Sequence, residues 1–331
     1  MTSREIVKRA IHFQNPPRIP YNYDSNRDNC AEYFGDDFIW CFVDKAPGFE
    51  SVNADGDRVD EWGCVWKSMG ETFGEPTTFP LKDLERYSDM QFPSFDDPVR
   101  YETVRKIVRE NNGEKYVMGM LPTGIFQIMI HLFGFEDFMY QIAGNTEEYT
   151  ALAGRLCDLC IRTIHRFADA GVDGVILIED MGLQDRMMIS PQMWHDIYAP
   201  LYTRMFEAAH ARGLDVISHT CGHIVSILDD YIACGLDVIQ MDQQDNMGLE
   251  TLHQFAGRVC FFCPMDIQTT GAFTREQAFE RTRRMVECLA TPAGGFMAKT
   301  YPQPDAIHVT NEYMRNMTDG FAAASKAYFG A

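Results

Sequence analysis

The 331-residue sequence lacks several features that would assign it to a large class of proteins. No apolar run approaches the ~20 residues that a membrane-spanning helix needs. Residues 1–5 lead into an amphipathic stretch, not into the uniform apolar core of a secretory signal. Basic residues are scarce, because 29 Lys and Arg stand against 48 Asp and Glu and give a net charge of −19. Since each neutralised phosphate needs a Lys or Arg, this balance argues against nucleic-acid binding. We therefore expect a soluble, cytoplasmic protein with no membrane or nucleic-acid partner.

We also expect no disulfide framework, although the sequence contains ten cysteines. They are scattered through a large chain without a secretory signal. In a reducing compartment most of them should be buried free thiols, with one or two left for chemistry or metal binding. The composition, with 46% hydrophobic and 23% charged residues, is ordinary for a globular protein. A chain of this length buries about three quarters of its unfolded surface, so a sizeable core needs no disulfide.

From about residue 114 onward, short β-rich runs alternate with helical stretches. The expected strands span residues 116–121, 172–179, 214–219, 238–241, 259–263 and 295–298, and the expected helices span residues 146–170, 191–212, 224–234, 274–289 and 311–328. This alternation predicts parallel strands joined by helical crossovers. A (β/α)8 barrel and a doubly wound sheet are the two architectures that fit.

The positions of the polar residues favour the barrel. Polar clusters follow the ends of five expected strands, which is where a barrel enzyme assembles its active site from βα loops. A doubly wound sheet would more often carry a glycine-rich phosphate turn, and the sequence has no G-x-G-x-x-G motif. We therefore predict an α/β fold, a (β/α)8 TIM barrel that spans residues 1–331 as a single domain. Residues of about 24–113 are expected to form an irregular, β-rich excursion from it.

The sharpest chemical pattern is the pair His219 and Cys221 at the end of an expected strand. Side chains two residues apart on a strand point to the same side, and imidazole and thiolate are usual ligands of zinc. Packing of a buried His and a small apolar Cys is the alternative interpretation. A catalytic zinc site usually has three protein ligands, and Glu179 and Cys263 compete for the third position. Cys260 should face away from Cys263 on the same strand, so we exclude it.

Further residues near the strand ends indicate acid–base and substrate-binding roles. Asp180 and Asp242 could exchange protons with a substrate, although Asp180 could equally cap a turn. Substrate contacts are expected from Met118, Met120, Met181, Arg186 and Gln240. An apolar wall with few cations suits an aromatic ring that bears a carboxylate or hydroxyl better than a polyanion. The same methionines could instead fill the barrel core.

Several segments together resemble the uroporphyrinogen decarboxylase superfamily. The segments, in order and spacing, are VDGV at 172–175, EDMG at 179–182, ISPQ at 189–192, HTCGH at 219–223 and MDIQ at 265–268. The segment DEWG at 60–63 resembles the methyltransferase-like members of that superfamily. The resemblance covers residues from about 5 to 325 and implies a (β/α)8 barrel with its site at the C-terminal mouth.

The superfamily that the sequence resembles has two branches with different chemistry. Porphyrinogen decarboxylases carry an arginine-rich N-terminal segment, and residues 18–24 lack that pattern. Cobamide-dependent methyltransferases hold zinc with a His-x-Cys pair and a distant Cys, and His219 and Cys221 match the pair. The distant Cys is expected after Gly294 and Gly295, where residues 296–301 contain none.

The methyltransferase branch implies zinc as the cofactor and a corrinoid protein as the partner. In this interpretation zinc acts as a Lewis acid on the atom that carries the methyl group of a small methylated substrate. The apolar residues near the strand ends favour a methoxylated aromatic as the donor, which would make the protein an O-demethylase. A tetrapyrrole decarboxylase and a non-catalytic corrinoid-binding barrel are the alternatives. The outer helices leave open whether the protein forms a homodimer.

Overall fold

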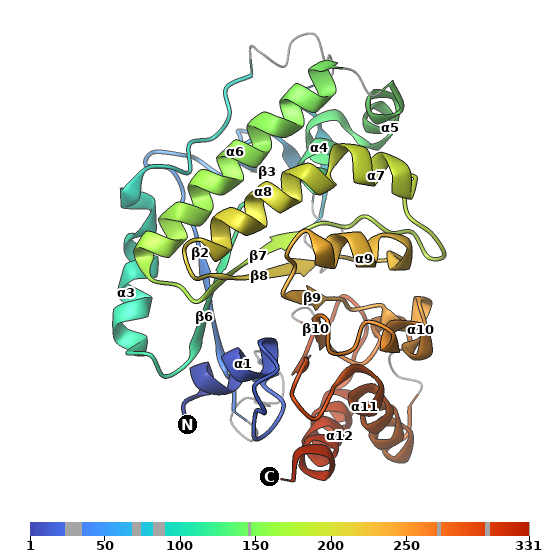
Figure 1. Cartoon of the computed structure of the whole chain (residues 1–331). Helices are drawn as coiled ribbons and strands as arrows, with labels where there is room; N and C mark the ends of the chain where they lie inside the picture. Colours follow the sequence, from blue (N-terminus) through green and yellow to red (C-terminus); the bar gives the residue numbers. More distant parts are fainter. Residues whose placement is uncertain are drawn as a thin grey trace.

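Eight parallel strands form one sheet in the computed structural model, and helices surround it (Figure 1). The structure describes residues 1–23, 35–67, 74–81, 90–144, 147–269, 273–301 and 305–330. In spatial order the strands are β1 (Tyr21–Asn22), β11 (Phe296–Lys299), β10 (Cys260–Cys263), β9 (Val238–Gln240), β8 (Asp215–His219), β7 (Gly174–Ile178), β6 (Tyr116–Met120) and β2 (Phe38–Phe42). Every pairing between neighbours in this sheet is parallel.

The two edge strands approach each other, so the sheet is a nearly closed barrel. The Asp37 N–H donates to the Tyr21 carbonyl oxygen at 2.8 Å, just before β2 begins. Farther along, the Trp40 indole N–H donates to Oδ1 of Asn22 on β1 at 3.2 Å. Parallel strands in a closed ring with outer helices are the TIM-barrel architecture. The predicted fold class is confirmed.

Side chains inside the barrel form their own apolar cluster, separate from the cluster between barrel and helices. The inner cluster comprises Phe38, Tyr116, Met118, Ile176, Ile217, Val238, Cys260, Phe262 and Met297 from the strands, together with Val7, Ala10 and Ile11. These last three belong to α1 (Ser3–Ile11), which packs on β6 and β11 and closes the N-terminal end of the barrel. The polar strand ends therefore lie at the opposite, C-terminal mouth.

Each of the five predicted helices is present, one of them as two helices, and further helices precede β7. The longer helices are α3 (Glu102–Asn111), α4 (Ile125–Phe133), α5 (Phe135–Gly144), α6 (Glu147–Ala170), α7 (Pro191–Ile197), α8 (Ala199–His210), α9 (Val225–Ala233), α11 (Arg275–Leu289) and α12 (Asn311–Phe329). The single helix expected over 191–212 is two helices, because Pro200 occupies the first turn of α8 and a proline ring cannot continue a preceding helix. No helix among the described residues is long and apolar enough to cross a membrane.

The range expected to form an irregular excursion contains more regular structure than the sequence predicted. It holds a small antiparallel sheet of β3 (Arg58–Val59), β4 (Val65–Lys67) and β5 (Glu75–Thr78). It also holds α3 and β2, and β2 is a barrel strand, which the sequence had not predicted. The small sheet contacts helix α4 through Trp66, whose ring meets the His131 ring edge-on with 4.9 Å between the ring centroids. Residues 24–34, 68–73 and 82–89 of this range lie outside the described residues.

Candidate metal centre

The candidate metal centre lies where the chain continues past the ends of β7 and β8. Ile178 and His219 are register partners, and beyond them the Glu179 N–H donates to the His219 carbonyl oxygen at 2.8 Å. Because side chains alternate along an extended chain, Asp180 and Cys221 point to the same side as His219. One ligand atom from each of these three residues lies within 4.8 Å of the other two. Asp180, His219 and Cys221 are therefore placed to share one ion.

The distances within the group are short. Nε2 of His219 lies 3.5 Å from Sγ of Cys221 and 3.4 Å from Oδ1 of Asp180. The same Oδ1 accepts a hydrogen bond from the Cys221 N–H at 2.9 Å. Nitrogen, sulfur and oxygen donors of this kind are the ligand set of zinc, and three protein ligands with a further position free are typical of catalytic zinc sites. The donor set thus fits zinc.

Two glycines allow the loops that follow β7 and β8 to come into close contact. The Gly182 N–H donates to the Cys221 carbonyl oxygen at 3.1 Å, and the His223 N–H donates to the Leu183 carbonyl oxygen at 2.7 Å. Gly222 has a φ of +78°, a conformation that other residues rarely adopt. The loops are so close that a Cβ at Gly182 would lie 2.4 Å from the His223 nitrogen. Glycine at both positions therefore permits the approach of Asp180 to Cys221.

A chain of polar side chains continues from His219 across the barrel mouth. Nδ1 of His219 is hydrogen-bonded to Oε1 of Gln240 on β9. Nε2 of Gln240 donates to Oδ1 of Asp242 at 2.8 Å, and Nζ of Lys299 on β11 donates to the same oxygen at 2.9 Å. All four residues occupy inward-facing positions, and Gln240, Asp242 and Lys299 are buried. A histidine that ligates a metal ordinarily donates its other ring N–H to such a partner.

The charges of the three candidate ligands influence one another. Burial raises the pKa of Asp180, but its hydrogen bond to His219 and the charge of that ring outweigh burial and lower the pKa. Burial lowers the pKa of His219, and its hydrogen bonds to Asp180 and Cys221 reverse this and raise the pKa well above the ordinary value. Burial raises the pKa of the Cys221 thiol. A bound cation would favour the deprotonated form of each ligand, as metal binding generally does.

Glu179, one of the two residues expected as the third ligand, faces the helices and not the mouth. It is fully buried, and its carboxylate accepts hydrogen bonds from the N–H groups of Ile125 at 2.6 Å and Gln127 at 2.9 Å at the start of α4. The Tyr202 hydroxyl of α8 donates to it at 2.7 Å. Burial raises the pKa of Glu179 to about 7. Glu179 therefore accepts hydrogen bonds from N–H groups at the start of α4 that have no partner within the helix. Its neighbour Asp180 lies beside His219 and Cys221 instead.

Cys263, the other expected ligand, is also turned away from the pair. Phe262 is the register partner of Gln240 and faces the interior, so Cys263 faces outward and packs in the cluster between the barrel and the helices. Burial raises the pKa of its thiol, which disfavours the thiolate form. Cys260 does face the interior, but it lies at the beginning of β10, near the closed end of the barrel. Among the described residues, neither cysteine belongs to the metal-binding group.

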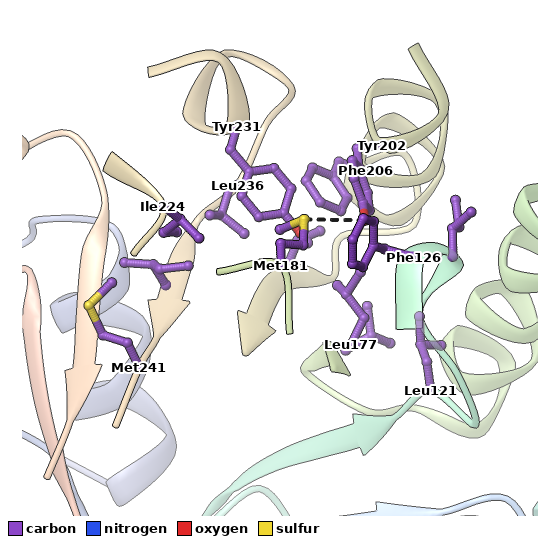
Figure 2. Packing of buried hydrophobic residues seen from close by; sticks show 14 of the residues in the cluster. Leu121, Phe126, Leu177, Met181, Tyr202, Phe206, Ile224, Tyr231, Leu236 and Met241 are labelled. Atoms are coloured by element: carbon purple, nitrogen blue, oxygen red, sulfur yellow. Dashed lines mark hydrogen bonds between the residues drawn. The ribbon is translucent and has the colours of Figure 1, made fainter. Parts of the chain in front are cut away.

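The residues expected to contact substrate are dispersed. Met118 is buried in the barrel core, and Met181 is buried outside the barrel. Figure 2 shows Met181 among the aromatic rings of α8 and α9, where its sulfur is 4.0 Å from the Tyr202 hydroxyl. Arg186 is exposed and pairs with Asp185 at 2.9 Å. Of the expected substrate contacts, Met120 remains as a partly buried residue on the interior face, and Gln240 serves as the partner of His219.

Other inward-facing side chains near the mouth are incompletely buried and were not singled out from the sequence. They are Trp40, Phe42, Ile178 and Tyr301. Trp40 and Phe42 are the register partners of Met118 and Met120, so they share the interior face with them. The signal that could have found Trp40 and Phe42 is the alternation along β2, a strand within the range expected to form the excursion. Together with Met120 they give the mouth an aromatic and apolar wall.

Comparisons with known proteins agree with this architecture. A model of the uroporphyrinogen decarboxylase family matches residues 68–298. A solved methyltransferase from Methanosarcina mazei is 14% identical and superimposes with a TM-score of 0.72, over 98% of this chain and 99% of that one. A B12-independent methionine synthase from Shewanella sp. W3-18-1 is 12% identical, with a TM-score of 0.48 over 68% of this chain and 65% of that chain. A search of curated protein sequences gave no significant match. At 14% identity, the likeness to the Methanosarcina mazei methyltransferase demonstrates a shared fold and does not establish the activity.

Proposed function

Because the chain belongs to the uroporphyrinogen decarboxylase family, we propose that it is a zinc-dependent methyltransferase of that family. It takes a methyl group from a small methylated donor and passes it to a corrinoid protein. The observation that carries the proposal is the convergence of Asp180, His219 and Cys221 on one point at the C-terminal mouth of the barrel. A carboxylate, an imidazole and a thiolate from adjacent βα loops make a three-ligand set of the kind that catalytic zinc sites use.

The three ligands and their neighbours divide the work of the site. Asp180, His219 and Cys221 hold zinc, which supplies Lewis acidity toward the donor atom that carries the methyl group. Asp180 therefore acts as a ligand in this proposal. Asp242 is occupied by Gln240 and Lys299, so its part is to orient neighbouring groups and not to exchange protons. The apolar wall excludes water from the donor and strengthens electrostatic interactions in the mouth.

A methoxylated aromatic is the donor that best suits the mouth. Trp40, Phe42 and Tyr301 offer aromatic faces on the interior side of the barrel, and Met120 adds an adaptable apolar contact. Aromatic side chains bind flat rings by offset stacking or edge-to-face contact. This wall replaces the methionines at 118 and 181 as the basis for an aromatic donor, since both of those side chains are buried elsewhere.

Tetrapyrrole decarboxylation, the activity after which the family is named, is the second candidate. A polycarboxylated substrate needs several free cations. Arg18 is committed to Asp37, with guanidinium–carboxylate distances of 2.8 and 2.7 Å. Among the described strand residues, Lys299 is the basic side chain that faces the interior, and it is paired with Asp242. The charges of the described mouth therefore favour a methyl donor over a tetrapyrrole.

A panel of substrates distinguishes these activities. The protein is incubated with methoxybenzoates, methanol, methylamines and methylthiols, each with a reduced corrinoid as acceptor, and methylcobalt formation is followed by absorbance. We expect transfer from the methoxybenzoates, and loss of transfer in Cys221→Ala but not in Cys263→Ala. Transfer from non-aromatic donors alone contradicts the donor assignment. Turnover of a polycarboxylated porphyrinogen by metal-free protein contradicts the whole proposal, and tight corrinoid binding without any transfer identifies a non-catalytic barrel.

A further inference from the structure

We infer that Lys299 is a positioning residue of the metal centre, because it fixes the tautomer of His219 through Asp242 and Gln240. The inference rests on the proposed zinc site and concerns side chains that do not themselves ligate the ion. Lys299, Asp242, Gln240 and His219 come from three strands, β11, β9 and β8, and form an unbroken chain of hydrogen bonds across the mouth. The donors and acceptors in this series of hydrogen bonds follow one order, which is set by the Lys299 ammonium group.

Each link leaves one arrangement of donors and acceptors. The Lys299 ammonium group can only donate, so Oδ1 of Asp242 accepts from it at 2.9 Å. An ionised carboxylate also can only accept, so the amide nitrogen of Gln240 must face Asp242, at 2.8 Å. The amide oxygen of Gln240 is thereby turned toward Nδ1 of His219. Nδ1 then keeps its proton when a cation binds, and Nε2, which faces Asp180 and Cys221, is the nitrogen that would provide the lone pair.

Burial of these side chains strengthens the preference for this arrangement of donors and acceptors. Asp242 is 3% exposed, Gln240 4% and Lys299 6%, so bulk water does not compete for their hydrogen bonds. Lys299 is the charged donor that holds the Asp242 carboxylate in place. Without this contact, Asp242 no longer fixes the Gln240 amide, which can rotate and present its NH2 group to His219. The proton would then lie on Nε2, the atom that must bind zinc. Lys299 therefore excludes the wrong tautomer from a distance of two intervening side chains.

Strand geometry explains why residues so far apart in sequence form one chain. His219 and Gln240 are register partners on β8 and β9, and Asp242 follows Gln240 on the same side two residues later. Lys299 ends β11, one strand beyond β10, and β10 contributes Phe262 at the level of Gln240. The long lysine side chain reaches past β10 to Asp242. An arginine can span the same distance and donate in the same way, which provides a conservative variant.

Zinc affinity tests the inference without reference to turnover. The dissociation constant for zinc is measured by competition with a chromophoric chelator at neutral pH in wild type, Lys299→Met, Lys299→Arg, Gln240→Met and the double variant Lys299→Met/Gln240→Met. Lys8→Met is the matched control, because Lys8 forms a comparable lysine–aspartate pair with Asp215, at 3.2 Å, at the opposite end of the barrel. Thermal unfolding of each variant reports whether it folds.

We expect Lys299→Met and Gln240→Met each to weaken zinc binding ~10–100-fold, as loss of an outer hydrogen-bond partner does. Lys299→Arg and Lys8→Met should bind zinc as wild type does. Since Lys299 acts through Gln240, the double variant should be no weaker than Gln240→Met alone. Additive losses, or wild-type affinity in a folded Lys299→Met, would overturn the positioning role while leaving the zinc site intact. If Lys299→Met does not fold, Lys299→Arg provides the test instead. Zinc binding by folded Lys299→Arg that is weaker than in wild type would overturn the positioning role. A wild-type protein that binds no zinc refutes both the site and the role.

Discussion

Gly182 and Gly222 lie back to back where the loops after β7 and β8 meet, and neither position has room for a Cβ. A Cβ on Gly222 would lie 2.2 Å from the Gly182 carbonyl oxygen, and one on Gly182 would lie 2.8 Å from the Gly222 Cα. The contact brings the backbone that carries Asp180 beside the backbone that carries Cys221. The distance between two of the proposed ligands is thus set by two residues that have no side chain.

This contact predicts the effect of Gly182→Ala. The new methyl group must push the loops apart, so we expect zinc affinity to fall ~10-fold or more and stability to fall by about 1–3 kcal/mol, as overpacking does. Chelator competition and chemical denaturation measure the two effects. Gly154→Ala is the control, because Gly154 lies within α6 and a Cβ there meets nothing within 4 Å. That control should bind zinc normally and gain about 0.5–1 kcal/mol of stability. Normal zinc binding by Gly182→Ala would contradict the importance of the close approach.

Substitution of Glu179 should affect stability, whereas substitution of Asp180 should affect zinc binding. Glu179→Ala removes the acceptor of the amide groups that begin α4 and of the Tyr202 hydroxyl. Leaving such buried donors without a partner costs about 1–3 kcal/mol each, so a loss of several kcal/mol is expected. Zinc content of the folded fraction should be unchanged. Asp180→Ala should show the opposite pattern, with weakened zinc binding and a small change in stability. Loss of zinc in folded Glu179→Ala would restore Glu179 as the third ligand.

The docking of α1 on the closed end of the barrel should depend on pH through His12. Its hydrogen bond to Asp215 at 2.9 Å raises the pKa of His12 above 6.5, against the lowering by burial; Asp237 raises this pKa too, and Lys8 lowers it. Because the pKa is raised in the folded state, the contribution to stability is fully present below pH ~6.5 and is lost as pH rises through the folded-state pKa. Denaturation of wild type and His12→Gln between pH ~6 and ~9 measures it. The wild type should be more stable at the acid end, and the difference should shrink toward the alkaline end. A difference that grows with pH would contradict the assigned interaction.

The barrel could be predicted from the sequence because its signals are local. Six of the eight strands were expected within a few residues of their observed bounds, since each is a short apolar run between helical stretches. β1 and β2 were missed as strands. β1 is two residues long, and β2 lies among turn-rich segments whose local pattern resembles an excursion. Only the pairing of β2 with β6 marks it as part of the barrel, and pairing is not visible in one sequence.

The candidate site was predicted in part for a related reason. His219 and Cys221 were found because two residues of the same strand end reveal their common side directly. Glu179 and Cys263 were chosen by residue type and proximity to a strand end. The alternation that was used to separate Cys260 from Cys263 also separates Glu179 from Asp180, but it needs the register between strands to tell which member faces the interior. The link from Gln240 to Lys299 crosses three strands and depends on that register throughout.

Zinc content after dialysis tests the central claim most directly. Wild type, Cys221→Ala and Cys263→Ala are dialysed against a weak chelator, and metal is measured by plasma mass spectrometry alongside protein concentration. The two cysteines face in different directions in the structure, Cys221 inward beside His219 and Cys263 outward into the core. We predict about one zinc per chain in wild type and in Cys263→Ala, and a loss of bound zinc in Cys221→Ala. Full occupancy in Cys221→Ala, or zinc lost from folded Cys263→Ala, would contradict the site described above.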